Sequence, residues 1–174
     1  IFDIIVSTDD PEVIKISKKL KVKAPFLRPA NLSNDKATSY SVCAHAVNFY
    51  EKKYSRIDVI LLLQPTSPFR SKKSIESIIK NFNKVKSKSV VSVQELKLNP
   101  LTLIKKKSNK NYYFLKNKNN IFKINGNFYL IEKNLFLKKK KFFLSDTLLF
   151  KTEDFKESID IDDINDLKLA KSFL

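Results

Sequence analysis

The sequence is poor in the residues on which several kinds of site depend. Its 174 residues include one cysteine, Cys43, one histidine, His45, and one glycine, Gly126. A single cysteine excludes both a disulfide within the chain and a zinc cluster. A serine–histidine–aspartate triad would have to use His45, and nothing near it resembles a nucleophile elbow. We therefore expect neither a hydrolase triad nor a disulfide scaffold.

Long apolar runs are also absent. No run approaches the length of a membrane span, and no signal-peptide pattern occurs. Hydrophobic residues make up 43% of the chain, close to the average of globular proteins. We expect one domain, residues 1–174, with a cytoplasmic location. Because the sequence begins with Ile1 inside an apolar run, we also expect that the true N-terminus is missing.

Basic residues are in large excess, with a formal net charge of +16. One interpretation is a nucleic-acid-binding domain. The other is a lysine-rich composition that coats every solvated face of an ordinary domain. The lysines are spread along the chain, and the arginines suited to reading base edges are few, namely Arg28, Arg56 and Arg70. This favours the second interpretation and leaves nucleic-acid binding as the alternative.

The first hundred residues alternate between strand and helix patterns. Nearly uninterrupted apolar runs predict buried strands at 1–6, 58–63 and 89–93. Apolar residues at helical spacing predict helices between these strands, including one that Ser71 caps. Such alternation is typical of an α/β fold with a parallel sheet.

The pattern changes over residues 97–145. This stretch is rich in Lys and Asn with scattered aromatic residues, and predicts hairpins and loops that form an arm outside the sheet. Asn125 and Gly126 stand between apolar residues, which is a strong signal for a hairpin turn. We therefore expect the arm to contain a hairpin centred on this pair.

Acidic and apolar residues alternate over residues 158–162. The alternation predicts a strand end that carries Asp160 and Asp162 on one face. Two carboxylates at this spacing suit one Mg²⁺ ion, which typically takes one or two carboxylates plus substrate phosphates. The alternative is a helix N-terminus decorated with acids, which also explains Asp163.

Polar clusters border several of the predicted elements. They are Ser7-Thr8-Asp9, Arg28-Pro29, the turn at 64–70 and the Asp160/Asp162 pair. Two of them follow buried strands directly, where ligands bind in open α/β sheets. Gln64 offers an amide at that edge, and two prolines stiffen the turn after it. The alternative is a turn that only caps the next helix.

Taken together, six strings resemble the acylneuraminate cytidylyltransferase family, the CMP-sialic acid synthetases and their relatives. In order, they are VSTDD at 6–10, PFLRPANLSNDKATS at 25–39, LLQPTSPFR at 62–70, SVVSV at 89–93, NGNFYLI at 125–131 and SIDID at 158–162. The resemblance implies a Rossmann-like, mostly parallel α/β sheet of the nucleotide-diphospho-sugar transferase type. It also implies a β-hairpin dimerisation arm, and hence a homodimer.

The resemblance implies a reaction as well. The anomeric hydroxyl of a nonulosonic acid sugar would attack the α-phosphate of CTP, and pyrophosphate would leave. Mg²⁺ would be the cofactor, held by the catalytic carboxylates Asp160 and Asp162. Arg28 and Ser39 would contact the cytidine, with Asp9 as a supporting residue. The product would be a CMP-sugar for cell-surface glycan synthesis.

The resemblance also assigns residues to the sugar site, and the sequence departs from the family pattern in two places. Gln64 would bind the sugar, Asn125 would line its pocket and Arg70 would support it. Lys123 stands near the place of a family arginine, which gives up bidentate binding of the sugar carboxylate. The N-terminal strand and glycine-bearing phosphate loop of the family have no counterpart here. A non-catalytic remnant of the family is therefore a further alternative.

Overall fold

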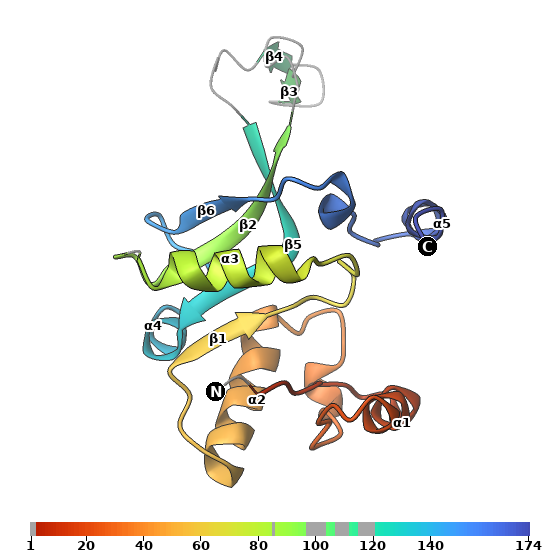
Figure 1. Ribbon diagram of the computed structural model, residues 1–174, viewed down its shortest axis with the longest axis vertical. Helices are drawn as coiled ribbons and strands as arrows, with labels where there is room; N and C mark the ends of the chain where they lie inside the picture. The colour runs from red at the N-terminus through yellow and green to blue at the C-terminus, as the bar shows by residue number, and fades with distance from the viewer. Residues whose placement is uncertain (1–2, 85, 97–103, 107–111, 115–120) are drawn as a thin grey trace. The chain divides into compact units, whose positions relative to one another are not determined.

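A computed structural model of the chain describes residues 3–84, 86–96, 104–106, 112–114 and 121–174 (Figure 1). The chain divides into two compact units. One is Ile1–Asp58 with Leu137–Lys141, and the other is Val59–Phe136 with Phe142–Leu174. Of the helices in the described ranges, none has the length and apolar character needed to cross a membrane.

The first unit is mainly helical. α1 (Pro11–Lys19) begins after Asp10, whose side chain accepts a hydrogen bond from the Glu12 amide, with Pro11 at the first helical position. η1 (Ala30–Leu32) and α2 (Ser39–Lys53) follow. The strand predicted at 1–6 is wrong within the described residues, because only Ile5 of this run forms a bridge there, an isolated parallel one with Lys23. Its residue Ile4 is 63% exposed, so this apolar run lacks the expected cover.

The second unit is built on a mixed sheet. Its four strands have the order β1-β5-β2-β6, and they are β1 (Val59–Leu62), β5 (Ile121–Glu132), β2 (Ser89–Leu96) and β6 (Leu148–Lys151). β2 pairs parallel with β6, whereas β5 pairs antiparallel with both β1 and β2. The strands predicted at 58–63 and 89–93 are confirmed. The mostly parallel sheet is corrected to a mixed one, because β5 inserts in the opposite direction.

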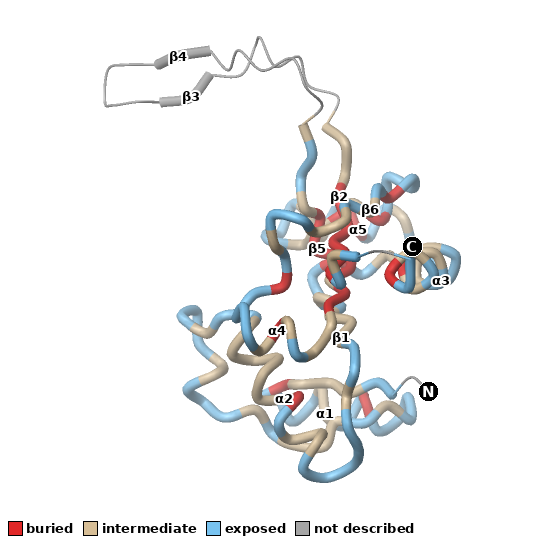
Figure 2. Tube along the Cα trace, turned by 90° about the vertical axis from the view of Figure 1, so that its left-hand side faces the viewer, coloured by how far each residue is buried: buried red, intermediate tan, exposed pale blue. Residues whose placement is uncertain are grey.

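The core of the second unit lies between this sheet and α3 (Lys72–Phe82). Ile78 and Phe82 of the helix pack against Val90 of β2 and against Phe128 and Leu130 of β5. The buried stretches of β2 and β5 are coloured red in Figure 2. Ser71 caps α3 by accepting a hydrogen bond from the Ser74 amide, as the sequence predicted.

A bulge interrupts β5 at the sole glycine. Val91 pairs with Tyr129 and Val93 pairs with Ile124, so Ser92 alone faces residues 125–128 of β5. Gly126 has φ +74°, a left-handed conformation that favours glycine. The predicted hairpin turn at Asn125-Gly126 is therefore wrong, since the chain continues in the same strand on both sides of the pair.

The region predicted as an arm has a mixed outcome. β3 (Ile104–Lys106) and β4 (Tyr112–Phe114) form an antiparallel two-stranded sheet, which agrees with a hairpin pattern. The predicted bounds of 97–145 are wrong, because β5 is an inner strand of the main sheet and α4 (Lys133–Lys139) follows it. The remainder of 97–120 lies outside the described residues.

The C-terminal segment ends in helices. η3 (Phe155–Ser158) is followed by α5 (Ile164–Lys171), which Asp163 caps in a capping box with Asp166. The predicted cap at Asp163 is confirmed. The strand predicted at 158–162 is wrong, because these residues form the end of η3 and a non-helical link.

Candidate functional site

The turn that follows β1 is tied to the middle of β5 through Arg70. The Gln64 carbonyl accepts hydrogen bonds from the Ser67 amide, at 3.2 Å, and from the Arg70 guanidinium. Arg70 Nε also donates to the Asn127 carbonyl at 3.1 Å. Burial lowers the pKa of Arg70, and the nearby charge of Asp160 opposes that change. In the structure Arg70 therefore supports the turn and the strand together.

Three oxygen atoms surround the backbone of Gly126. A Cβ placed there would lie 2.8 Å from Ser67 Oγ, 2.9 Å from Gln64 Oε1 and 3.5 Å from Asp160 Oδ2. Any residue other than glycine would thus displace the Gln64 or Ser67 side chain, besides occupying a strained backbone conformation. We call this arrangement of Gln64, Ser67, Gly126 and Asp160 the Gly126 cradle.

Hydrogen bonds hold Asp160 in the cradle. Ser67 is fully buried, and its hydroxyl lies 3.3 Å from Asp160 Oδ1 and 3.2 Å from the Asn125 carbonyl, to either of which it can donate. The Ile161 amide donates to the Thr66 carbonyl at 2.8 Å. Burial raises the pKa of Tyr129, and the charge of Asp160 adds to this rise. Asp160 is half-buried, and its carboxylate lies beside the buried Ser67 hydroxyl.

Asp162 lies in a different environment. It is exposed, and its backbone amide donates to the Asp166 carboxylate at 3.0 Å, within the cap of α5. No group of three or more His, Cys, Asp or Glu side chains suited to a metal ion occurs among residues that the structure describes. Mg²⁺ needs fewer protein ligands, since phosphates and water complete its shell. Asp160 and Gln64 bring carboxylate and amide oxygen atoms close to Gly126, and hard oxygen donors of this kind fit the ion.

Two predicted sugar-site residues, Asn125 and Lys123, lie on β5. The Asn125 side chain is fully buried, accepts from Ser92 Oγ at 2.6 Å and donates to Thr152 Oγ1 at 2.9 Å. It holds the bulge together, and its place in the lining of the sugar pocket stays a prediction. Lys123 is exposed on β5 opposite Gln94, away from the bulge residues 125–128.

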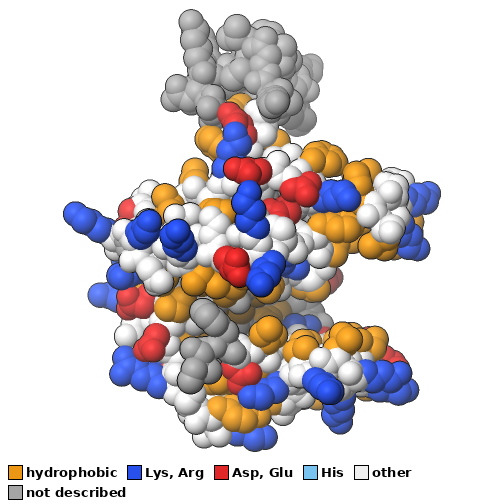
Figure 3. All heavy atoms as spheres, viewed as in Figure 1, with side chains coloured by type: hydrophobic (Ala, Val, Ile, Leu, Met, Phe, Trp, Pro, Cys, Tyr) orange, Lys and Arg blue, Asp and Glu red, His pale blue; other side chains and the backbone are white. Residues whose placement is uncertain are grey.

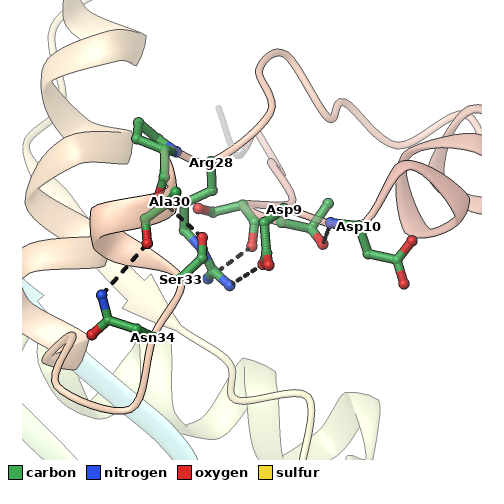
Figure 4. Close-up of polar contacts among 9 residues, drawn as sticks. Asp9, Asp10, Arg28, Ala30, Ser33 and Asn34 are labelled. Atoms are coloured by element: carbon green, nitrogen blue, oxygen red, sulfur yellow. Dashed lines mark hydrogen bonds and ion pairs between the residues drawn. The ribbon is translucent and has the colours of Figure 1, made fainter.

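Two of the nucleotide residues predicted in the first unit, Asp9 and Arg28, form a polar cluster (Figure 4). Arg28 Nη2 lies 2.6 Å from Asp9 Oδ1, and Arg28 Nε donates to Ser33 Oγ at 3.1 Å. The guanidinium holds the pKa of Asp9 below its usual value. The Arg28 amide donates to the Thr8 carbonyl at 2.7 Å, which fixes the two segments side by side. Asp9 and Arg28, both predicted as nucleotide residues, are therefore in direct contact, and their role toward a nucleotide stays a prediction.

Ser39 is the third of the predicted nucleotide residues. Ser39 is exposed at the first turn of α2, directly after the cap residue Thr38. Lys and Arg side chains on the face seen in Figure 3 are spread among acidic ones and form no single basic patch there. This distribution agrees with lysines that solvate an ordinary surface.

Sequence reasoning missed three residues of this region as site residues. Ser67 stood inside the turn that was singled out, and Gly126 was interpreted as a hairpin residue. Glu157, which is 3% exposed, carried no local signal, because an acid beside a lysine is usually on the surface. The lone glycine of a 174-residue chain was the one signal that could have indicated a close approach.

Comparisons with known proteins agree with the family resemblance of the six strings. A family model described as cytidylyltransferase matches residues 1–173. The chain is 32% identical to the CMP-N,N'-diacetyllegionaminic acid synthase of Legionella pneumophila, over 99% of this chain and 78% of that protein. It is 32% identical to a pseudaminic acid cytidylyltransferase of Campylobacter jejuni, over 55% of this chain and 41% of that protein.

A further relative matches over a shorter stretch. The chain is 36% identical to an N-acylneuraminate cytidylyltransferase of Escherichia coli, over 52% of this chain and 20% of that protein. The family model covers residues 1–173, and the alignment with the Legionella protein spans 99% of this chain. The chain therefore belongs to the cytidylyltransferase family and is a nucleotidyltransferase.

Proposed function

We propose that the protein transfers CMP from CTP to a nonulosonic acid, giving a CMP-sugar and pyrophosphate for cell-surface glycan synthesis. The names of the three relatives support the sugar class, because legionaminic, pseudaminic and neuraminic acids are all nonulosonic acids. The match of the family model supports the cytidylyl donor.

The Gly126 cradle is the observation that carries this proposal. It brings the side chains of Gln64 and Asp160 to one point from segments far apart in the sequence. An amide oxygen shortly after β1 and a carboxylate from the segment after η3 suit a polyhydroxylated sugar beside a phosphate. A turn that served only to cap α3 would not need Gly126, which lets the Gln64 and Ser67 side chains approach the backbone of β5.

The residues of the second unit have distinct proposed roles. Gln64 binds the sugar hydroxyl groups, and Arg70 fixes the turn that presents it. Asp160 and Asp162 hold Mg²⁺, which would neutralise phosphate charge and favour an in-line displacement. Lys123 stays a proposed contact of the sugar carboxylate.

Arg28, Ser39 and Asp9 of the first unit are the proposed nucleotide residues. Asp9 holds the Arg28 guanidinium in one orientation through their ion pair. An oriented guanidinium loses less side-chain entropy when it binds a polar ligand. Ser39 presents its hydroxyl at the first turn of α2, where backbone amides favour a polar partner.

The reaction follows from these roles. The anomeric oxygen of the sugar forms a bond to the α-phosphorus of CTP, and the bond from that phosphorus to the bridging oxygen of pyrophosphate breaks. The hydroxyl proton is released, and pyrophosphate leaves with the negative charge. Orientation of the two substrates by the chain supplies a large part of the rate in such a displacement.

We also propose that the protein is a homodimer. Phe122 at the start of β5 is 40% exposed, and an aromatic side chain at this position suits a partner surface. Tyr112 and Phe114 belong to the same predicted arm, and their side chains lie outside those described. Light scattering at micromolar concentration should give twice the mass of the chain, and a strict monomer would contradict this proposal.

Pyrophosphate release tests the proposed function. With Mg²⁺ and a nonulosonic acid, we expect release with CTP and little with ATP or GTP. Omission of the sugar is the control, and it should abolish release. Equal rates with a purine nucleotide, or release that does not depend on the sugar, would argue against the proposal.

A further inference from the structure

Glu157 is the only charged residue that is buried among the residues the structure describes. It is 3% exposed and lies in η3, three positions before Asp160. A carboxylate in the interior is costly unless hydrogen bonds or charges compensate it. We therefore expect hydrogen-bond donors around the Glu157 carboxylate.

The start of α3 provides those partners. Glu157 Oε1 accepts a hydrogen bond from the Ser71 amide at 2.8 Å, and Oε2 accepts one from Ser74 Oγ at 2.8 Å. The N-terminus of a helix carries a partial positive charge and free amide groups, both of which stabilise an anion. Glu157 thus anchors η3 to the residues that directly follow the Gln64 turn.

The backbone around Glu157 is anchored as well. Its carbonyl accepts from Asn127 Nδ2 at 3.1 Å, and the same amide group lies 3.3 Å from the Phe69 carbonyl. Four residues further on, the Ile161 amide donates to the Thr66 carbonyl at 2.8 Å. Asp160 lies between these two anchors, so its backbone is fixed relative to both the turn and β5.

We propose that Glu157 is a positioning residue that sets the Asp160 carboxylate in the Gly126 cradle. It does so by fixing residues 157–161 against the N-terminus of α3 and the bulge of β5. The inference rests on the proposed function for its kinetic readout, and on the structure alone for its hydrogen-exchange readout. Glu157 touches neither substrate nor metal in this account, so it acts through Asp160.

Three variants separate positioning from general stability. Glu157→Ala removes both carboxylate contacts, and we expect kcat to fall about 100-fold with little change in the KM for CTP, since small displacements of a reacting group have effects of this size. Glu157→Gln keeps an acceptor for the Ser71 amide and offers a donor to Ser74 Oγ, so it should restore most of the turnover. Glu153→Ala is the matched control, because the Glu153 side chain is 89% exposed.

Ser74→Ala covers the case in which Glu157→Ala does not fold. It removes the contact to Oε2 and leaves the Ser71 cap of α3 in place, so kcat should fall less but in the same direction. In each variant, hydrogen exchange of the Ile161 amide reports whether the anchor to Thr66 has loosened. We expect faster exchange in Glu157→Ala and Ser74→Ala, and wild-type exchange in Glu157→Gln and Glu153→Ala.

The two readouts distinguish the possible failures. Wild-type turnover in Glu157→Ala would overturn the inference, as would lost turnover with unchanged Ile161 exchange. If the unaltered protein makes no CMP-sugar, the proposed function fails, and the exchange of Ile161 alone decides the positioning role. Faster exchange in Glu157→Ala and Ser74→Ala would then still support it, and unchanged exchange would overturn it.

Discussion

The two units of the molecule hold their polar clusters in different ways. In the first unit, Asp9 and Arg28 form an ion pair with side chains 46% and 22% exposed. In the second unit, the cradle is built on the fully buried Ser67 and on a glycine whose missing side chain leaves the space for Gln64 and Asp160. One cluster is organised by charge near solvent, and the other by packing.

This difference has energetic consequences. An exposed ion pair is weakened by water and by salt, so its geometry is easily changed. A buried hydrogen-bond network behaves differently, because each unmet partner is costly in a low dielectric. We therefore expect substitutions in the second unit to have larger effects on turnover than substitutions in the first.

Loss of a carboxylate from the proposed Mg²⁺ site should have the largest effect on turnover. Asp160→Asn and Asp162→Ala each remove a negative charge from the proposed Mg²⁺ site, and kcat should fall about 1000-fold, since such a metal is worth several kcal/mol in the transition state. Circular dichroism should show an unchanged fold. Near-normal turnover of either variant at saturating Mg²⁺ would exclude that residue from the metal site.

Gly126→Ala should have the next largest effect. Its Cβ would crowd Ser67 and Gln64, and its φ of +74° is unfavourable for alanine. We expect a loss of about 1–3 kcal/mol in the free energy of unfolding and a fall in kcat of about 100-fold. Urea unfolding and steady-state kinetics measure the two. A variant as stable and active as the wild type would show that the cradle does not need the glycine.

Arg28→Ala tests the first unit. Removing the guanidinium takes away a charged donor from the nucleotide, and the KM for CTP should rise about 10-fold while kcat holds. Asp9→Asn should have a smaller effect in the same direction, because it only frees the orientation of Arg28. A fall in kcat that matches the Asp160 variant would break the distinction between the two units.

Labelling of Cys43 concerns the smallest expected effect on turnover. Its measurable result is the rate at which the thiol reacts with a thiol reagent. Burial raises the pKa of its thiol from 9.0 to about 12. At pH 8 its reaction with a thiol reagent should be about 1000-fold slower in the folded protein than in urea. Because the folded pKa is the higher one, the associated stability is present below pH 9.0 and declines as the pH rises toward 12. Equal labelling rates would show that this part of the first unit is open.

Local pattern predicted much of the fold. The strands at 58–63 and 89–93, the Ser71 cap of α3 and the Asp163 cap of α5 all depend on neighbouring residues, and all four are confirmed. The place of β5 could not be read in this way. Asn-Gly signals a hairpin and a bulge alike, and only pairing with β1 and β2, which are distant in sequence, decides between them.

Local pattern likewise predicted one part of the candidate site, and contacts distant in sequence determine the other. Gln64 and Arg70 follow β1, as the sequence predicted for that turn, whereas Asp160 follows η3 and not a strand. The roles of Ser67 and Glu157 depend on contacts across 93 and 86 positions of the chain, which no local pattern contains. The apolar run at 1–6 had the composition of a buried strand, but among its described residues only Ile5 forms a bridge, an isolated one with Lys23.

The most direct test of the account is the product itself. ³¹P NMR would follow CTP, Mg²⁺ and N,N'-diacetyllegionaminic acid in the presence of the full chain. The account predicts a new phosphodiester signal from the CMP-sugar, which grows in step with pyrophosphate and is absent without the sugar. If the folded protein produced no phosphodiester with this sugar, or with pseudaminic or N-acetylneuraminic acid, CMP transfer to a nonulosonic acid would be contradicted.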